Sequence, residues 1–129
     1  MQDLKIVRRI CLAAVALAGA LPVCAHHSQA MFDADKKLTL SGTVKEFQFS
    51  NPHCYIQLLV PTETNQGGSD EWSIELGAPA HLLRGGWKPK TLKPGDKITV
   101  IINPLRDGAK GGHYQSGTWA DGKSLAVQP

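Results

Sequence analysis

From Leu38 onward, apolar and polar residues alternate in short runs, and this period of two constrains the fold more than any other feature. Alternation over residues 38–44 is typical of a strand that is buried on one face. The apolar phase then shifts to Phe47 and Phe49. A phase shift within one run predicts a β-bulge near Lys45–Glu46, and Gly42 would ease the same curvature.

The order of the predicted elements indicates the fold class. Three strands, one short helix and then two or three strands describe an all-β chain with one short helix. We expect an OB-like Greek-key barrel of five to six strands. A β-sandwich is the alternative, but an interposed helix in about 100 residues favours the barrel. Strands are predicted over residues 38–49, 53–60, 71–76, 97–102, 113–120 and 123–127, and the helix over 78–84.

Residues 1–25 have the features of a secretion signal. A basic start is followed by the apolar run Ile10–Leu21 and by small residues that end at Ala25. The run is shorter than the ~20 residues needed to cross a bilayer. We therefore expect cleavage near Ala25, a periplasmic location and no transmembrane segment in the processed chain. Lipidation at Cys24 is the weaker alternative.

Cleavage would leave residues 26–129 as one domain, which begins with an arm over 26–36. This part holds 11 Lys and Arg against 10 Asp and Glu, so its net charge is near +1. A near-neutral balance in an exported protein predicts a periplasmic partner or a small ligand and no nucleic acid. Cys54 is the one cysteine that would remain, and we expect it to be buried and not a reactive thiol.

Two adjacent histidines would begin the processed chain. A free His26 offers its amine and a ring nitrogen to one metal ion, and His27 adds a second imidazole. Amine and imidazole donors suit copper(II) best among the common divalent metals. His53 or His113 would complete the set of ligands. The alternative is that the histidine pair is only an exposed polar end.

Other residues are candidates for ligand contacts or for chemistry. We expect Trp87, in a loop after two glycines, to be an exposed aromatic contact, with Tyr55 and Asn51 as further candidate ligand contacts. Glu71 and Glu75 share a strand face that we expect to be solvated. Acid/base catalysis by this pair is the least favoured function, and the sequence contains no nucleophile elbow, phosphate loop or HExxH motif. Trp72 is expected in the core, and His81 on the surface.

Short motifs occur along the chain in the order His26-His27-Ser28, Phe32-Asp33, Leu40-Ser41-Gly42-Thr43-Val44, Phe47, Asn51-Pro52-His53, Trp72-Ser73-Ile74-Glu75, Gly86-Trp87 and Leu92-Lys93-Pro94-Gly95-Asp96. This ordered set resembles a family of small exported bacterial proteins of unknown function. The resemblance implies a periplasmic single-domain β protein without an assigned reaction. Cys54 departs from the aliphatic or aromatic residue that such proteins often have after the NPH turn. The leading hypothesis is thus a non-enzymatic periplasmic binding module, with copper handling as its more specific version and a metal-free ligand-binding or structural barrel as the alternative.

Overall fold

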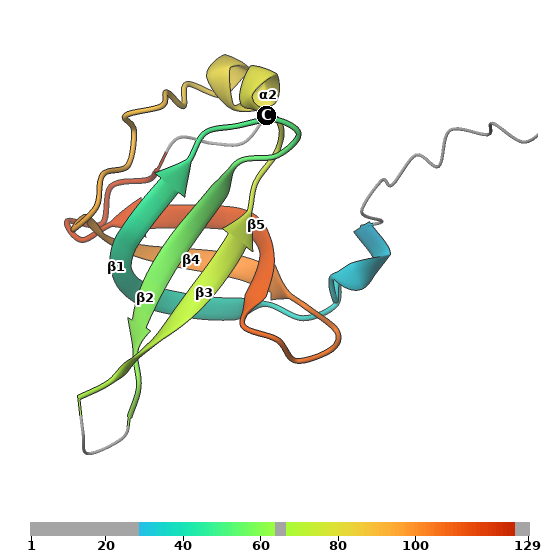
Figure 1. Ribbon diagram of the computed structural model, residues 1–129, viewed down its shortest axis with the longest axis vertical. Helices are drawn as coiled ribbons and strands as arrows, with labels where there is room; N and C mark the ends of the chain where they lie inside the picture. The colour runs from blue at the N-terminus through green and yellow to red at the C-terminus, as the bar shows by residue number, and fades with distance from the viewer. Residues whose placement is uncertain (1–28, 64–66, 126–129) are drawn as a thin grey trace, which may run out of the picture.

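The computed structural model describes residues 29–63 and 67–125 and shows a closed five-stranded barrel (Figure 1). The strands follow one another around the barrel in the order β1-β2-β3-β5-β4. All neighbouring strands are antiparallel except β3 and β5, which are parallel. The predicted all-β, OB-like barrel with one short helix is therefore confirmed. Its elements are η1 (Gln29–Met31, a 3-10 helix), β1 (Leu38–Gln48), β2 (Tyr55–Pro61), β3 (Ser69–Glu75), α2 (Pro79–Arg84), β4 (Lys97–Pro104) and β5 (Gly111–Trp119).

The last predicted strand is not formed over the described residues. Residues 123–127 were expected to pair with β5, but Ser124 makes only an isolated bridge to Thr118, and residues 126–129 lie outside the described part. The other strands begin or end within two residues of the prediction. The barrel therefore has five strands, the lower end of the expected range.

Strand β1 is long enough to join both sides of the barrel because it bends in its middle. Its first half pairs with β4, from Leu38 opposite Ile102 to Thr43 opposite Lys97, and its second half pairs with β2. The register with β2 shifts between Val44 and Glu46, where the bulge was predicted. At the bend, a Cβ on Gly42 would collide with the backbone of the neighbouring strand, so this position requires glycine.

The barrel interior is filled by the alternating apolar residues, and α2 covers one end (Figure 1). Leu82 of α2 and Trp87 are fully buried. The expectation that Trp87 is an exposed contact is wrong. Gly86, at a φ of +88°, turns the chain back after the helix, and the indole packs against Phe47 and Tyr114, each with ring centroids 5.7 Å apart. The indole thus completes the core.

Two further expectations about burial can be compared with the fold. Cys54 is fully buried, as predicted, and burial raises the pKa of its thiol, so it is not a thiolate at neutral pH. Trp72 is only half-buried and packs against the edge of the core.

Within the described residues no helix is long and apolar enough to span a bilayer, and the predicted secretion signal lies outside those residues.

Candidate functional site: a histidine-lined pocket on the barrel wall

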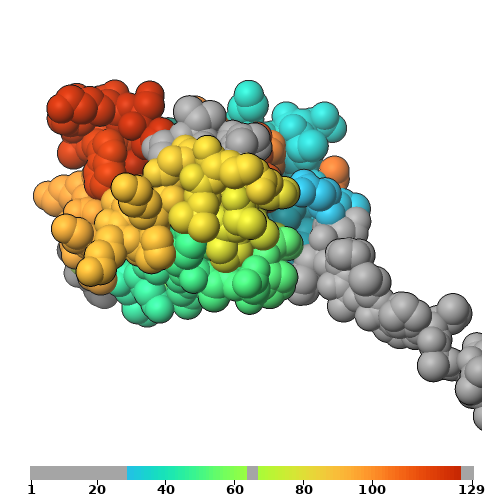
Figure 2. Space-filling view, turned by 90° about the horizontal axis from the view of Figure 1, so that it is seen from above, coloured from blue at the N-terminus to red at the C-terminus, as the bar shows by residue number. Residues whose placement is uncertain are grey.

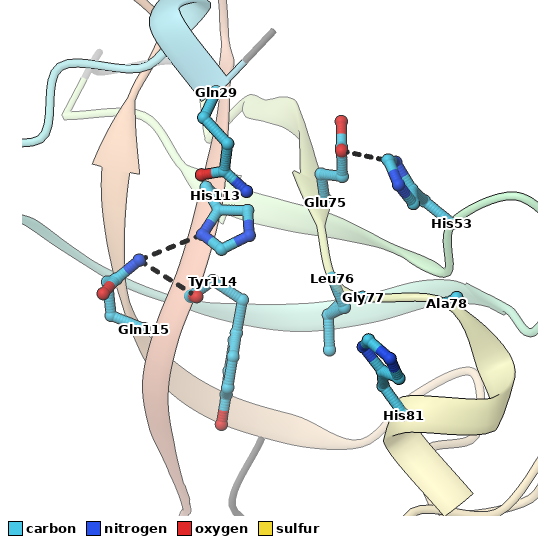
Figure 3. A pocket seen from close by; sticks show the side chains of 10 residues that line it. All are labelled: Gln29, His53, Glu75, Leu76, Gly77, Ala78, His81, His113, Tyr114 and Gln115. Carbon is cyan, nitrogen blue, oxygen red and sulfur yellow. Dashed lines mark hydrogen bonds and ion pairs between the residues drawn. The ribbon is translucent and has the colours of Figure 1, made fainter. Parts of the chain in front are cut away.

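A pocket of about 500 Å³ opens where the start of β2, the end of β3, α2 and the start of β5 come together. Three imidazoles border it from different sides (Figure 3). Two of them were predicted as metal ligands and lie 60 positions apart in the sequence. The pocket is lined by Gln29, His53, Glu75, Leu76, Gly77, Ala78, His81, His113, Tyr114 and Gln115.

His53 is held by a carboxylate that the barrel withdraws from solvent. Its Nδ1 lies 2.6 Å from Oε1 of Glu75, whose side chain is only 12% exposed. This contact lies off the direction in which Nδ1 would donate, so Nδ1 has no aligned hydrogen-bond partner among the described residues. Tyr55 donates its hydroxyl to the other oxygen of Glu75 at 3.1 Å. Glu75 contacts only Nδ1 of His53, so the second ring nitrogen, Nε2, is the one that could bind a ligand.

Glu75 corrects the expectation that both glutamates of β3 face solvent. Glu71 does so, and it forms an exposed ion pair with Lys45 at 2.6 Å. Glu75, four residues later on the same face, instead lies in the pocket wall. The physical reason is its place at the end of β3, between Tyr55 of β2 and His113 of β5 in the register. The negative charge near Tyr55 and, above all, burial raise the pKa of that tyrosine.

His113 enters the pocket from β5. Its Nδ1 lies 3.0 Å from the side-chain amide nitrogen of Gln115, and its ring contacts Phe32 at a centroid distance of 5.5 Å. Burial lowers the pKa of His113, while the carboxylate of Glu75 acts in the opposite direction and the charge of His53 in the same direction. Glu75 and His53 therefore both lie close enough to His113 to affect its pKa. His113 is neutral at pH 7, the form that binds metals.

His81 is a third pocket residue, which the sequence analysis placed only on the surface. It is exposed, as expected, but its ring borders the pocket from α2 (Figure 3). No pattern in the sequence connects His81 with His53 or His113. The connection arises because α2 crosses the end of the barrel directly after β3.

The described residues do not by themselves form a closed metal site. Among residues 29–63 and 67–125, no three His, Cys, Asp or Glu side chains are close enough together to hold one ion. His26 and His27, the other two predicted ligands, lie outside the described residues. A metal ion held at this pocket would therefore need donors from the chain before Gln29 or a change in the side chains that line it.

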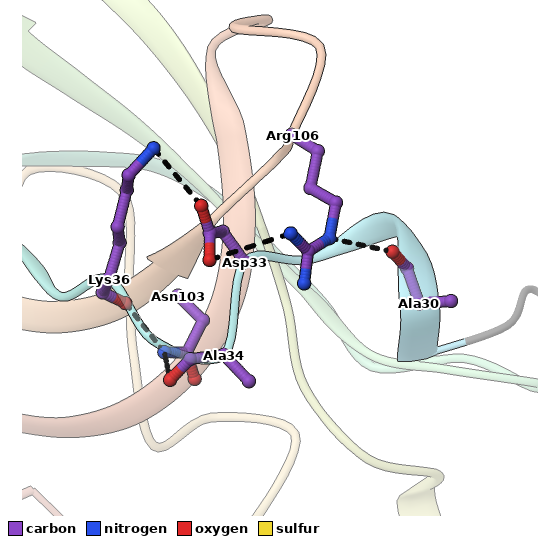
Figure 4. Close-up of polar contacts among 6 residues, drawn as sticks. All are labelled: Ala30, Asp33, Ala34, Lys36, Asn103 and Arg106. Atoms are coloured by element: carbon purple, nitrogen blue, oxygen red, sulfur yellow. Dashed lines mark hydrogen bonds and ion pairs between the residues drawn. The ribbon is translucent and has the colours of Figure 1, made fainter.

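The N-terminal arm is fastened to the far end of β4, and this brings Gln29 to the pocket. Asp33 lies between Lys36, at 3.1 Å, and Arg106, at 3.6 Å (Figure 4). Arg106 also donates its Nε to the carbonyl of Ala30, and the buried Asn103 donates to the carbonyl of Lys36. The hydrogen bond from Lys36, together with both cations, holds the pKa of Asp33 below its usual range.

The three residues predicted as ligand contacts, Tyr55, Asn51 and Trp87, lie in different parts of the structure. Tyr55 supports Glu75 and lines a smaller neighbouring pocket of about 170 Å³, which also includes Glu75. Asn51 is exposed in the turn before β2 and does not line the histidine pocket. Trp87 belongs to the core. Of the three, only Tyr55 is connected to the histidines.

Fold and site together define a small OB-fold protein with a histidine-lined pocket on its wall. The chain belongs to a family of unknown function (DUF6152), whose model matches residues 13–115. The resemblance to a family without an assigned reaction is therefore confirmed. Export and the individual motifs are not tested by this match. A search of curated proteins found no match.

Solved structures support the fold. The chain is similar to the mitochondrial single-stranded DNA-binding protein Rim1 of S. cerevisiae, with 9% identity and a TM-score of 0.50 over 66% of this chain and 93% of that one. A selenomethionine-labelled structure of Rim1 matches with 11% identity and a TM-score of 0.45 over the same shares. At this identity the likeness shows a shared OB fold.

The prediction that excludes nucleic acid is corrected by this comparison. A barrel of the same fold belongs to a protein described as binding single-stranded DNA, so the fold is compatible with that ligand. The exclusion relied on a net charge near +1 for residues 26–129. Net charge is a poor guide here, because five exposed basic residues and a single acidic residue occupy positions 84–97. The charge balance of the whole domain hides this local excess.

Proposed function

We propose that this protein is a periplasmic binding module that holds a copper(II) ion at the histidine pocket. His53 and His113 would be the ligands from the barrel, and His26 and His27 the ligands from the processed N-terminus. Copper would act as bound cargo or as a structural ion, and the proposal includes no catalytic step. The proposal requires export and removal of residues 1–25.

The distribution of histidines carries the proposal. The chain has five, and three of them line one pocket. The other two precede Gln29, itself a pocket residue, by two and three positions. Successive Cα atoms span at most ~3.6 Å of extended chain, so the Cα of His27 is within about 7 Å of that of Gln29 and the Cα of His26 within about 11 Å. Every histidine of the chain is thus in the pocket or within reach of it.

The chemistry of these donors fits copper(II) better than the hard cations. Imidazole and amine nitrogens bind copper(II) most tightly in the divalent series, whereas Mg²⁺ and Ca²⁺ prefer oxygen. Oε1 of Glu75 lies 2.6 Å from Nδ1 of His53. A turn of the ring would let Nδ1 donate to this carboxylate, as metal-bound histidines commonly do, and would leave Nε2 to bind the ion. Since the described residues contain no complete set of three ligands, the free end at His26 is an essential part of the site.

A metal titration of the exported protein tests the proposal. The N-terminus is first determined by mass spectrometry, and copper(II) binding is then followed by visible absorption and by electron paramagnetic resonance. We expect one equivalent to bind with nitrogen hyperfine structure. The double variant His53→Ala, His113→Ala should lose at least about a hundredfold in affinity, since ligands contribute more than their 10–100-fold supporting contacts. Extending the chain by one residue before His26 should change the spectrum.

Gln57→Ala is the matched control, because Gln57 lies on the same face of β2 two positions from Tyr55 and does not line the pocket. It should bind copper as the wild type does. Equal affinity and identical spectra for the wild type and the double histidine variant would show that the N-terminus binds copper without the pocket. A single-stranded oligonucleotide serves as a second probe, because single-stranded DNA is the ligand named for the yeast protein.

A further inference from the structure

A second surface of this molecule carries a strong local charge that the pocket does not use. Residues 84–97 connect α2 to β4 and include one acidic residue, Asp96. Residues 26–129 as a whole hold 11 basic and 10 acidic residues, so everything outside this segment has six basic and nine acidic ones. The chain is therefore polarised. The basic residues of the segment, all exposed, are Arg84, Lys88, Lys90, Lys93 and Lys97; these five side chains are called the basic patch below.

No side chain of the basic patch forms an ion pair with a carboxylate in the part of the chain that the structure describes. There, the Lys and Arg side chains in ion pairs all lie outside the patch, namely Lys36, Lys45, Arg106, Lys110 and Lys123. The one acidic residue of the segment, Asp96, accepts a hydrogen bond from the backbone nitrogen of Lys93 at 2.8 Å. Exposed cations without acidic partners are available to an anionic surface.

The segment that bears these cations is held firmly on the barrel. The backbone nitrogen of Gly95 donates to the carbonyl of Val44, and that of Val44 donates to the carbonyl of Asp96, both at 2.8 Å. Lys88 donates its backbone nitrogen to the hydroxyl of Thr91 at 2.7 Å. Together with α2 the segment forms much of the face seen from above (Figure 2). Little ordering is thus required when this surface meets a partner.

An exposed leucine adjoins the cations. Leu83, the residue before Arg84 on α2, is 54% exposed and is one of two large apolar side chains exposed in the described part of the chain. Trp87, the one aromatic residue among 84–97, is fully buried. Single-stranded nucleic acids are bound by basic grooves with exposed aromatic rings on which bases stack. A basic surface with an exposed aliphatic residue instead matches anionic lipid headgroups and the interface below them.

We propose that the basic patch, with Leu83 at its edge, docks the protein on a membrane surface rich in anionic phospholipid. Each cation near such a surface adds about fivefold to the partition coefficient. Five cations and one leucine predict reversible, salt-sensitive association of a peripheral protein. This proposal is independent of the metal site, because none of the five basic residues lines the histidine pocket.

Vesicle sedimentation tests the proposal with the exported protein in the presence of EDTA, so that metal binding plays no part. We expect binding to vesicles that contain phosphatidylglycerol and none to phosphatidylcholine alone. Raising the salt from about 0.1 M to about 1 M shortens the screening length from about 10 to about 3 Å and should release the protein. The triple variant Lys88→Gln, Lys90→Gln, Lys93→Gln should bind roughly a hundredfold more weakly.

The matched control is Lys36→Gln, Lys37→Gln, Lys110→Gln, which removes the same number of positive charges. These lysines lie near the start of β1 and beyond the end of β4, whereas the basic patch lies before and at the start of β4. It should keep vesicle binding within about threefold, because charges beyond a screening length contribute little. Both triple variants have the same N-terminus as the wild type, so any contribution of residues 1–28 to vesicle binding is the same in all three proteins. Equal vesicle binding by the two triple variants would overturn the proposal. Binding to a single-stranded oligonucleotide without binding to vesicles would also overturn it and would assign the patch to nucleic acid.

Discussion

The barrel interior and the histidine pocket share the same strands but follow different rules. The interior needs only apolar side chains at alternating positions, and several residue types would fill it. The pocket needs His53, Glu75 and His113 at single positions on three strand ends, together with α2. The difference teaches that substitutions in the interior should affect mainly stability, whereas substitutions in the pocket should affect mainly binding.

Trp87→Ala should have the largest effect and tests the interior. The indole is fully buried between Phe47 and Tyr114, so its loss leaves a large cavity. We expect the free energy of unfolding, measured with urea, to fall by about 3–5 kcal/mol. Trp119→Ala, at a half-buried position, is the comparison and should cost clearly less. Equal losses for the two variants would mean that Trp87 does not close the core.

Glu75→Gln tests the pocket and should affect copper binding more than stability. The amide removes the carboxylate oxygen beside Nδ1 of His53 but can still accept the hydrogen bond of Tyr55. We expect copper(II) affinity to fall by about 10–100-fold, because the orienting carboxylate is lost. The free energy of unfolding should change by about 1 kcal/mol or less, because the contact is isolated and partly exposed. Glu71→Gln, on the same strand face, should leave the affinity unchanged.

The smallest effect concerns the pH dependence of stability. Because burial lowers the pKa of His113, the unfolded chain binds its proton more readily than the folded protein. The stability contributed by neutral His113 is complete above the unfolded pKa near 6.5 and is lost as the pH falls below it. His113→Asn should therefore flatten the loss of stability between about pH 7.5 and about pH 5.5 in EDTA. Gln57→Ala should retain the slope of the wild type; an unchanged slope in His113→Asn would contradict the prediction.

Much of the fold could be predicted from the sequence, because strand periodicity is local. The bulge near Lys45–Glu46, the burial of Cys54 and the short helix after β3 all follow from neighbouring residues. Trp87 was misplaced because the two glycines before it suggest an exposed loop. Its burial depends on the way the chain after α2 folds back over the open end of the barrel.

The candidate site was only partly accessible from the sequence. His53 and His113 were predicted as ligands from residue type alone, and the pairing of β3 with β2 on one side and β5 on the other brings them to one pocket. His81 and Glu75 were assigned to the surface, because nothing near them in the sequence indicates that α2 and the start of β5 line one pocket with the end of β3. The ligand roles of His26 and His27 and the export of the chain stay predictions.

The sequence by itself determined that this chain forms a small β-barrel with one helix, since alternation and turn residues act over a few positions. It also determined how few histidines there are and that two of them stand side by side. Only the tertiary structure decided that the other three meet at one pocket and that Glu75 is withdrawn from water. The physical reason is that closing the barrel brings strand ends and α2 together over long sequence separations, and these contacts leave no local trace in the sequence.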